Sequence, residues 1–355
     1  MCDSLYSDQP GQEAHNCMKT PSEFGTSPAS AGLPAIQPGI EHLIGNTPLV
    51  KLQRVFAGLP HTVLAKLEFL NPSGSVKDRM SKYIIEDAEQ RGLIKPGDLI
   101  IDNSSGNTAI SVAMLGTVKG YRTMFTVPDK TSQEKIDLIK SLGAEVVICP
   151  HDVPHDHPDS YYSTARRLAK KLGAFLIDQY HNPKNIECHY VTTGPEIWEQ
   201  TGGKFDIFIA GIGTGGTYSG VARFLREKNP RIKCIAVDPV GSIFYEYLKT
   251  GQIGDARTYK VEGIGTDVLT RAMDYAVVDD VIQVDDREAF HAAREVANKE
   301  GMLVGGSSGS AIAAIRRLAQ GLAEPKTIVT ILPDTGMRYL SKFLNDNWMR
   351  DNNFM

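Results

Sequence analysis

Short apolar runs that alternate with helical segments constrain the fold of this 355-residue chain more than any other feature. The runs are VLAKLEF (63–69), DLIID (98–102), TMFTVP (123–128), EVVICP (145–150), FLIDQ (175–179), FDIFIAG (205–211), IKCIAVDP (232–239), VIQVDD (281–286) and TIVTILP (327–333). Continuous apolar runs divided by helices are typical of parallel strands that are covered on both faces. The pattern predicts an α/β doubly wound fold.

The segments between these runs carry the helical patterns that such a fold requires. They cover 77–91, 132–142, 159–171 and 184–200, with further helices starting at Asn107 and at Gly216. In doubly wound sheets the active site lies beyond the carboxyl ends of the strands, often above helix N-termini. The residues just after each apolar run are therefore the candidates for chemistry.

Composition narrows the classes of function. A net charge of −4 gives no indication of binding to nucleic acid or an anionic membrane. No apolar run approaches the ~20 residues that span a bilayer. The first residues carry no apolar stretch and do not predict a signal peptide. Residues 1–38 are rich in Ser, Pro, Gly and Ala and predict a flexible N-terminal tail, with order beginning near Ile40.

The cysteines and histidines do not predict a metal site. An odd number of widely spaced cysteines indicates neither a disulfide framework nor zinc and favours the reducing cytoplasm. These are Cys2, Cys17, Cys149, Cys188 and Cys234. His151, His155 and His157 fit a solvated loop better than a metal site, because no spacing places them on one helical face.

Two loops offer an amine and an anion site. NPSGSVKDR (71–79) places Lys77 after a strand and a small-residue turn. An isolated lysine at a helix start is usually a solvated charge, but this position lets a ligand approach closely. Ser104-Ser105-Gly106-Asn107-Thr108 then opens a helix with hydroxyls and free N–H groups that suit a carboxylate or phosphate. The alternative there is ordinary N-capping by Ser105 or Asn107.

Two glycine-rich loops follow. In GIGTGGTYSG (211–220) Gly211, Gly213 and Gly216 match G-x-G-x-x-G, and Asp238 stands about 20 residues on, as in a dinucleotide site. The segment 213–217 could equally cradle one phosphate. GGSSGS (305–310) opens another helix, either as a capped turn or as a binding loop.

A nicotinamide dehydrogenase would use only the glycine-rich loop 211–220. A pyridoxal phosphate (PLP) site uses all four loops, for a Schiff-base amine, a substrate anion cradle, a phosphate cup and a partner of the pyridine nitrogen. A non-catalytic protein that kept the fold is a third hypothesis, against which the intact Lys77, Asn107 and Ser307 argue.

At this point the chain from about Ile40 to Trp348 resembles the cysteine synthase (O-acetylserine sulfhydrylase) family of fold-type II PLP enzymes, and within it the catalytic core of cystathionine β-synthases. The motifs in family order are IGNTPLV, LNPSGSVKDR, SSGNT, DQY, GTGGT, VEGIG, GGSSGS and LPDTGMRYLSKFLNDNW. The resemblance implies two doubly wound three-layer α/β domains with the active site in the cleft between them. It implies a large PLP-binding domain over 39–84 and 190–355, and a smaller mobile substrate-binding domain over 85–189.

The resemblance also implies residue roles. Lys77 would form the Schiff base with pyridoxal 5'-phosphate and move the α-proton, which requires burial to lower its pKa. Asn107 would contact the ring hydroxyl and Ser307 the pyridine nitrogen. The phosphate would be held by Gly213, Thr214, Gly215, Gly216 and Thr217. The substrate carboxylate would be bound by Ser104, Ser105, Thr108 and Gln179 around Gly106, with Tyr180 and Gly263 nearby.

The implied reaction is β-replacement on serine or an activated serine through an aminoacrylate. The expected form joins serine and homocysteine to cystathionine. The alternatives are cysteine synthesis from O-acetylserine and sulfide, or a specialised synthase with another nucleophile. Because Ser307 is neutral, the pyridine nitrogen is expected to stay unprotonated, which favours loss of the β-substituent over transamination. A cytoplasmic homodimer with small amino-acid substrates and a small nucleophile, and without nucleic acid, membrane or metal, is expected.

Departures from the family pattern leave the substrates open. The chain reads Ser104-Ser105-Gly106-Asn107-Thr108-Ala109 where the family reads Thr-Ser-Gly-Asn-Thr-Gly, and Asp102-Asn103 where it reads Glu-Pro. Thr266 stands where some relatives carry Tyr. The haem-like spacing of Cys2 and His15 is attributed to chance, and the paired regulatory domains of some relatives are not expected after Met355.

Overall fold

The computed structural model describes residues 36–355. The predicted flexible tail over 1–38 and the Cys2–His15 pair therefore lie almost wholly outside the described residues. Gly39–Met355 form one compact unit, which contains two separate sheets.

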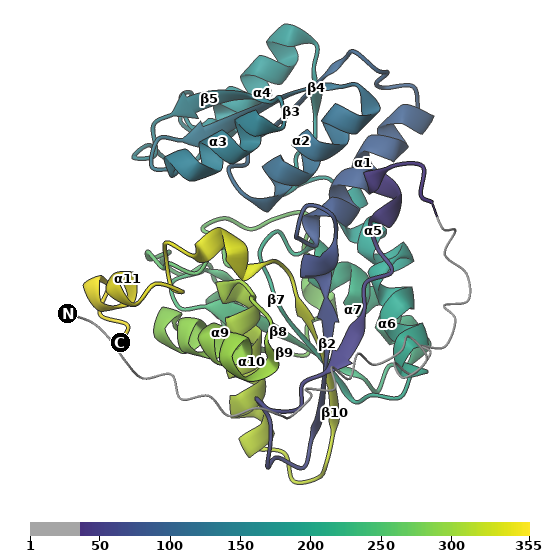
Figure 1. The fold of residues 1–355 in the computed structure, drawn as a ribbon, viewed down its shortest axis with the longest axis vertical. Coiled ribbons are helices and arrows are strands. Elements are labelled where there is room, and N and C mark those ends of the chain that lie inside the picture. Colours follow the sequence, from purple (N-terminus) through teal and green to yellow (C-terminus); the bar gives the residue numbers. More distant parts are fainter. Residues whose placement is uncertain (1–35) are drawn as a thin grey trace, which may run out of the picture. The chain divides into compact units, whose positions relative to one another are not determined.

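The larger sheet has six strands in the order β1-β2-β10-β7-β8-β9. Their bounds are Leu49–Lys51 (β1), Thr62–Leu67 (β2), Thr327–Leu332 (β10), Ile207–Gly211 (β7), Lys233–Pro239 (β8) and Asp280–Val284 (β9). All neighbours are parallel except β1, which runs antiparallel to β2. The non-consecutive order brings β2, β10 and β7 side by side although they come from distant parts of the chain (Figure 1).

The smaller sheet has four parallel strands in the order β5-β4-β3-β6. Their bounds are Leu99–Asp102 (β3), Arg122–Pro128 (β4), Glu145–Cys149 (β5) and Phe175–Leu176 (β6). Every residue of β3 is buried, as a strand covered on both faces must be. The two parallel sheets with their helices confirm the predicted α/β class.

Helices connect the strands and cover the sheets (Figure 1). Those that accompany the smaller sheet are Lys77–Gln90 (α1), Asn107–Lys119 (α2), Gln133–Ser141 (α3) and Tyr161–Leu172 (α4). Those that accompany the larger sheet are Lys184–Val191 (α5), Thr193–Thr201 (α6), Gly216–Lys228 (α7), Phe244–Thr250 (α8), Asp286–Glu300 (α9), Gly306–Gln320 (α10) and Asp346–Asp351 (α11).

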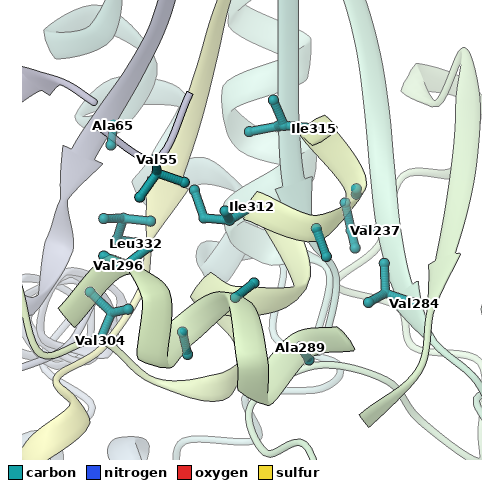
Figure 2. Packing of buried hydrophobic residues seen from close by; sticks show 14 of the residues in the cluster. Val55, Ala65, Val237, Val284, Ala289, Val296, Val304, Ile312, Ile315 and Leu332 are labelled. Carbon is teal, nitrogen blue, oxygen red and sulfur yellow. The ribbon is translucent and has the colours of Figure 1, made fainter. Parts of the chain in front are cut away.

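The main core lies between the larger sheet and the pair α9 and α10 (Figure 2). Val237 and Val284 from the sheet belong to this core together with Ile312 and Val296 from the two helices, and all four side chains are fully buried. The last residues of the chain close this core, because Phe343 stacks on Phe290 with ring centroids 5.0 Å apart. Removing one such buried aliphatic side chain costs about 2–5 kcal/mol.

The structure refines the predicted elements in three places. The segment 184–200 is two helices rather than one, because Thr192 leaves helical geometry with φ −123° and ψ −72°. The run 175–179 forms a two-residue strand and then turns at Asp178, which adopts a positive φ of 50°. β1 was not predicted, because its three residues pair at an edge and carry no long apolar run.

Candidate active site

Lys77 is the first residue of α1, at the carboxyl end of β2. The turn before it contains Gly74 with φ 83°, a conformation that glycine adopts without strain. The Val76 N–H donates to the Pro333 carbonyl at 2.8 Å, which ties the turn to the end of β10. The N-cap residue Val76 gives α1 no side-chain cap, and the Lys77 N–H donates to the Ser75 hydroxyl at 3.3 Å.

The two residues after Lys77 are anchored in the protein. Asp78 is fully buried and accepts hydrogen bonds from the Ser73 N–H at 2.7 Å and from the Ser111 hydroxyl. Arg79 is also buried and pairs with Glu68 at 2.7 Å and Glu196 at 2.6 Å. These partners come from the segment just after β2, from α2 and from α6, so they fix the first turn of α1 and hold Lys77 in place.

The Lys77 amine has a pKa suited to proton transfer. Loss of water around the amine lowers its pKa from 10.5 to about 8, although the nearby Asp334 carboxylate opposes that shift. Asp334 is itself buried and accepts hydrogen bonds from Asn107 Nδ2 at 2.9 Å and the Tyr339 hydroxyl at 2.7 Å. Burial raises the pKa of the Asp334 carboxyl. Sequence reasoning gave Asp334 no role, although it directly follows the apolar run 327–333 and precedes Thr335 and Gly336.

The glycine-rich loop lies against Lys77. A narrow cavity of about 30 Å³ is shared by Lys77, Gly213, Thr214, Gly215 and Thr217. Gly215 has φ 93°, and a Cβ there would lie 2.5 Å from the Cβ of Met273. Only glycine fits this turn, and it leaves the start of α7 without a side-chain cap.

A larger cavity of about 950 Å³ adjoins Lys77 on its other side. It brings together most of the predicted site residues: Lys77, Ser104, Ser105, Gly106, Asn107, Thr108, Gln179, Tyr180, Gly213, Thr214 and Gly263. Two predicted residues do not line either cavity. Ser307 is buried in the first turn of α10, close to Gly263: a Cβ added to Gly263 would lie 3.9 Å from the Ser307 hydroxyl oxygen. Gly216 lies beneath the loop against Asn185.

The predicted substrate loop follows β3. α2 begins at Asn107, its N-cap is Gly106, and no side chain caps it, so Ser105 and Asn107 do not act as N-caps. The Thr108 hydroxyl donates to Gln179 Oε1 at 2.8 Å, and Gln179 Nε2 lies 3.4 Å from Asp102. This chain fixes the Gln179 amide with its nitrogen toward Asp102.

Asp102 closes β3 as a fully buried carboxyl. Burial raises its pKa to about 7, with a further contribution from Asp178, while backbone N–H groups oppose the shift. Its Oδ1 and the Nδ2 of Asn103 are buried polar atoms that have no hydrogen-bond partner within residues 36–355. Asn103 lines the larger cavity, and a buried unpaired polar group at a cavity wall indicates that a ligand or water completes this side of the site.

Tyrosine rings form one wall of the larger cavity. The rings of Tyr161 and Tyr162 lie 4.0 Å apart, and that of Tyr180 lies 5.9 Å from Tyr162 in a T-shaped arrangement. His155 packs on Tyr162 with centroids 3.9 Å apart. Burial raises the pKa of all three tyrosines, so their hydroxyls stay protonated near neutral pH.

An ion-pair bridge borders the larger cavity, which Lys135 and Glu262 line. Glu262, next to Gly263, pairs with Lys135 of α3 and with Lys342 near the chain end. The three side chains are between 21% and 33% exposed, so solvent partly screens the pairs. The bridge links α3, beside the smaller sheet, to a loop of the larger sheet.

Sequence reasoning also missed two residues of α5. Asn185 Nδ2 donates to the Gln179 carbonyl at 2.9 Å and to the Thr214 hydroxyl oxygen at 3.0 Å. His189 Nε2 lies 3.1 Å from the Thr217 hydroxyl. Burial and nearby cations lower the pKa of His189 well below its usual value, so its ring is neutral. Their i, i+4 spacing on a helix that packs on α7 is the only signal that could have found them.

The rival hypotheses find little support in the geometry. Asp238 is buried and accepts from the Tyr245 N–H at 2.9 Å, and it lines neither cavity. His151 pairs with Asp129 at 2.5 Å, and His157 accepts from the Asp159 N–H at 3.1 Å. Among residues 36–355 no cluster of three or more His, Cys, Asp or Glu could hold a metal ion, and no helix is long and apolar enough to cross a membrane.

Comparisons with known proteins identify the class. Residues 40–334 match the family model described as "Pyridoxal-phosphate dependent enzyme", and the chain belongs to this family. Its dependence on PLP excludes the nicotinamide dehydrogenase.

Particular relatives fall within this class. The chain is 46% identical to cystathionine beta-synthase of Rattus norvegicus over 325 residues, which cover 91% of this chain and 58% of that protein. It is 38% identical to cysteine synthase 1 of Emericella nidulans over 88% of this chain and 85% of the relative. The crystal structure of O-ureido-L-serine synthase superposes with a TM-score of 0.81 at 34% identity, covering 89% of this chain and 99% of that one. The chain spans less than two thirds of the length of the cystathionine beta-synthases that it matches.

The residues present fit PLP. A Schiff-base cofactor needs an amine that is partly neutral near pH 7, and Lys77 has one. A phosphate needs hydrogen-bond donors at an uncapped helix start, which the segment 213–217 and α7 provide. The Thr214 hydroxyl oxygen accepts hydrogen bonds from Asn185 Nδ2 and from the Gly216 N–H. Its own hydrogen has no acceptor within residues 36–355.

Proposed function

We propose that this enzyme replaces the β-substituent of serine or an activated serine, and that it joins serine to homocysteine to give cystathionine. In that reaction the Cβ–O bond of serine breaks and a Cβ–S bond forms. The thiol proton leaves with the hydroxyl as water. The single observation that carries the proposal is the position of Lys77, whose amine of lowered pKa stands where the glycine-rich cavity meets the larger one.

The proposed residue roles follow from this arrangement. Lys77 and the segment 213–217 would hold PLP, with Asn107 and Ser307 at its ring. Bound PLP withdraws electrons from Cα of the amino acid attached to it, which weakens the Cα–H bond and lets the β-substituent leave. Lys77 Nζ would accept the Cα proton and return it. At a pKa of about 8, roughly a tenth of such amines is neutral at pH 7, far more than at the ordinary value of 10.5.

The substrate side orients the amino acid. We assign the substrate carboxylate to the hydroxyls and N–H groups over 104–108 and to Gln179. This loop starts an uncapped helix, where the free N–H groups and the helix dipole favour an anion. The tyrosine wall would limit access of water to Cβ, so that the nucleophile rather than water forms the new bond.

Cysteine synthesis is the second candidate. It is supported by the 38% identity to cysteine synthase 1 of Emericella nidulans over 88% of this chain. Both candidates share every residue role above and differ in the β-substituent that leaves and the nucleophile that enters.

We also propose the organisation of the molecule. A large PLP-binding domain would comprise 39–84 and 190–355, and a smaller mobile domain 85–189. The enzyme would be a cytoplasmic homodimer. Cys149, Cys188 and Cys234 are buried free thiols, which is consistent with a reducing compartment. Size-exclusion chromatography with light scattering tests the dimer.

The deciding experiment offers the PLP-loaded enzyme pairs of substrates. Serine, O-acetylserine or O-phosphoserine is mixed with homocysteine, sulfide, cysteine or an amine, and products are identified by mass spectrometry. Cystathionine from serine and homocysteine as the fastest product supports the first candidate, and cysteine from O-acetylserine and sulfide supports the second. Bound PLP without any β-replacement product from these pairs would overturn the proposal and favour a non-catalytic protein.

A further inference from the structure

Asn185 joins the two sides of the site through one amide group. Its side chain is 1% exposed, and Nδ2 directs one hydrogen to the Gln179 carbonyl at 2.9 Å and the other to Thr214 Oγ1 at 3.0 Å. A backbone carbonyl can only accept. The amide therefore cannot be turned to place its oxygen there, and its orientation is fixed.

The amide orientation determines where the Thr214 proton points. Thr214 Oγ1 receives the Asn185 hydrogen and faces a second donor, the Gly216 N–H, at 3.5 Å. A hydroxyl has two acceptor positions and one hydrogen to give. Because both donors face the lone pairs of Thr214 Oγ1, the hydroxyl hydrogen must point away from Asn185 and Gly216. Thr214 lines both cavities beside Lys77, and no acceptor for that hydrogen lies within residues 36–355.

The close packing of α5 on α7 makes this arrangement possible. A Cβ on Gly216 would overlap the side-chain carbonyl of Asn185, and one on Gly220 would lie 2.7 Å from both the His189 Cβ and the Tyr190 N–H nitrogen. Both glycines therefore let α5 approach close enough for Asn185 to reach the loop. His189, one turn further along α5, places its Nε2 atom 3.1 Å from the hydroxyl oxygen of Thr217.

We propose that Asn185 is a positioning residue, which turns the Thr214 hydroxyl so that it donates to the phosphate of PLP. This inference rests on the proposed assignment of the phosphate to the segment 213–217. A hydroxyl that donates to a phosphate anion forms a charge-assisted hydrogen bond. When Asn185 is replaced by an acceptor, the Thr214 hydrogen turns back toward α5 and the phosphate loses that bond.

The test measures the dissociation constant of PLP from the full chain by fluorescence titration after the cofactor has been removed. Asn185→Asp retains the shape but presents carboxylate oxygens to Thr214, and we expect PLP to bind about 10- to 100-fold more weakly. Asn182→Asp is the matched control, because Asn182 also donates its amide to a backbone carbonyl, that of Ile177, at 3.0 Å. The control should bind PLP within about twofold of the wild type, whatever it does to thermal stability.

A double-mutant cycle separates positioning from a general structural effect. Thr214→Val removes the hydroxyl. If Asn185 acts through it, adding Asn185→Asp to Thr214→Val should weaken PLP binding much less than Asn185→Asp alone does. Additive effects of the two substitutions, or normal PLP affinity in Asn185→Asp, would overturn the inference. Normal affinity in Thr214→Val would instead overturn the assignment of the phosphate cup, so the two failures are distinguishable.

Discussion

The cofactor side and the substrate side of the site differ in how their polar groups are satisfied. On the cofactor side, the hydroxyls of Thr214 and Thr217 have partners from α5, and Arg79 pairs with Glu196 of α6. Asp334 Oδ1 and the Tyr218 hydroxyl are buried there without partners within residues 36–355. On the substrate side, Asp102 Oδ1 and Asn103 Nδ2 are buried without partners within residues 36–355. The hydroxyls of the 213–217 loop are thus held by side chains of the protein, whereas the two atoms at the end of β3 need a ligand or water to complete their hydrogen bonding.

Removing the Lys77 amine, which lies between the two sides, should have the largest effect. Lys77→Ala should lower the rate of β-replacement by about 10³-fold or more, because the base at Cα is lost. Lys82→Ala is the control on the same helix, since Lys82 only approaches Glu86 at 3.9 Å. Borohydride followed by peptide mapping should place PLP on Lys77 in the wild type and in Lys82→Ala. More than a tenth of normal activity in Lys77→Ala would contradict the assignment.

Two buried aspartates at strand ends offer an intermediate test. Burial raises the pKa of Asp102 and of Asp238 to about 7. Each folded-state carboxyl therefore binds more protons than the unfolded one, and its contribution to stability falls as pH rises from about 3.8 to about 7. Asp102→Asn and Asp238→Asn should both raise Tm at pH 8 by a few degrees, and less at pH 5.

Only one of these aspartates borders the substrate loop. Above pH 7 the ionised Asp102 repels the substrate carboxylate, so Asp102→Asn should lower KM for the first substrate about threefold at pH 8. The change should disappear at pH 6, where Asp102 is mostly protonated. Asp238→Asn should leave KM unchanged at both pH values. Equal effects on KM at pH 6 and pH 8 would refute a role for the Asp102 charge.

The smallest expected effect concerns the ion-pair bridge of Glu262 beside the larger cavity. Glu262→Gln removes the carboxylate shared by Lys135 and Lys342, and KM for the first substrate should rise about two- to fivefold at low salt. Because the pairs are partly exposed, the difference from the wild type should shrink in about 1 M salt. Asp137→Asn on α3 is the control, because Asp137 is exposed, lines neither cavity and has no ion pair in the described part of the chain. A salt-independent difference would show that the bridge does not act through charge.

The sequence predicted those parts of the fold and site that depend on local patterns. The apolar runs locate the parallel strands, and small residues after them locate Lys77, the 104–108 loop and the 213–217 loop. Asn185 could not be found in this way, because it contacts the site from a helix distant in the chain. Asp334 directly follows the apolar run 327–333, and the sequence analysis overlooked it. The break at Thr192 and the strand β1 were missed because tertiary contacts, rather than periodicity, determine them.

The close contact of α5 and α7 has a consequence for the order in which the molecule becomes competent. Gly220 lies within a helix, where alanine would ordinarily be the better residue, yet a methyl group there would press on the main chain of α5. Because Asn185 reaches Thr214 only when the two helices have docked, a chain in which α5 is still detached has no finished phosphate pocket. Uptake of PLP during refolding should therefore report the docking of this helix pair and lag behind the recovery of helical content.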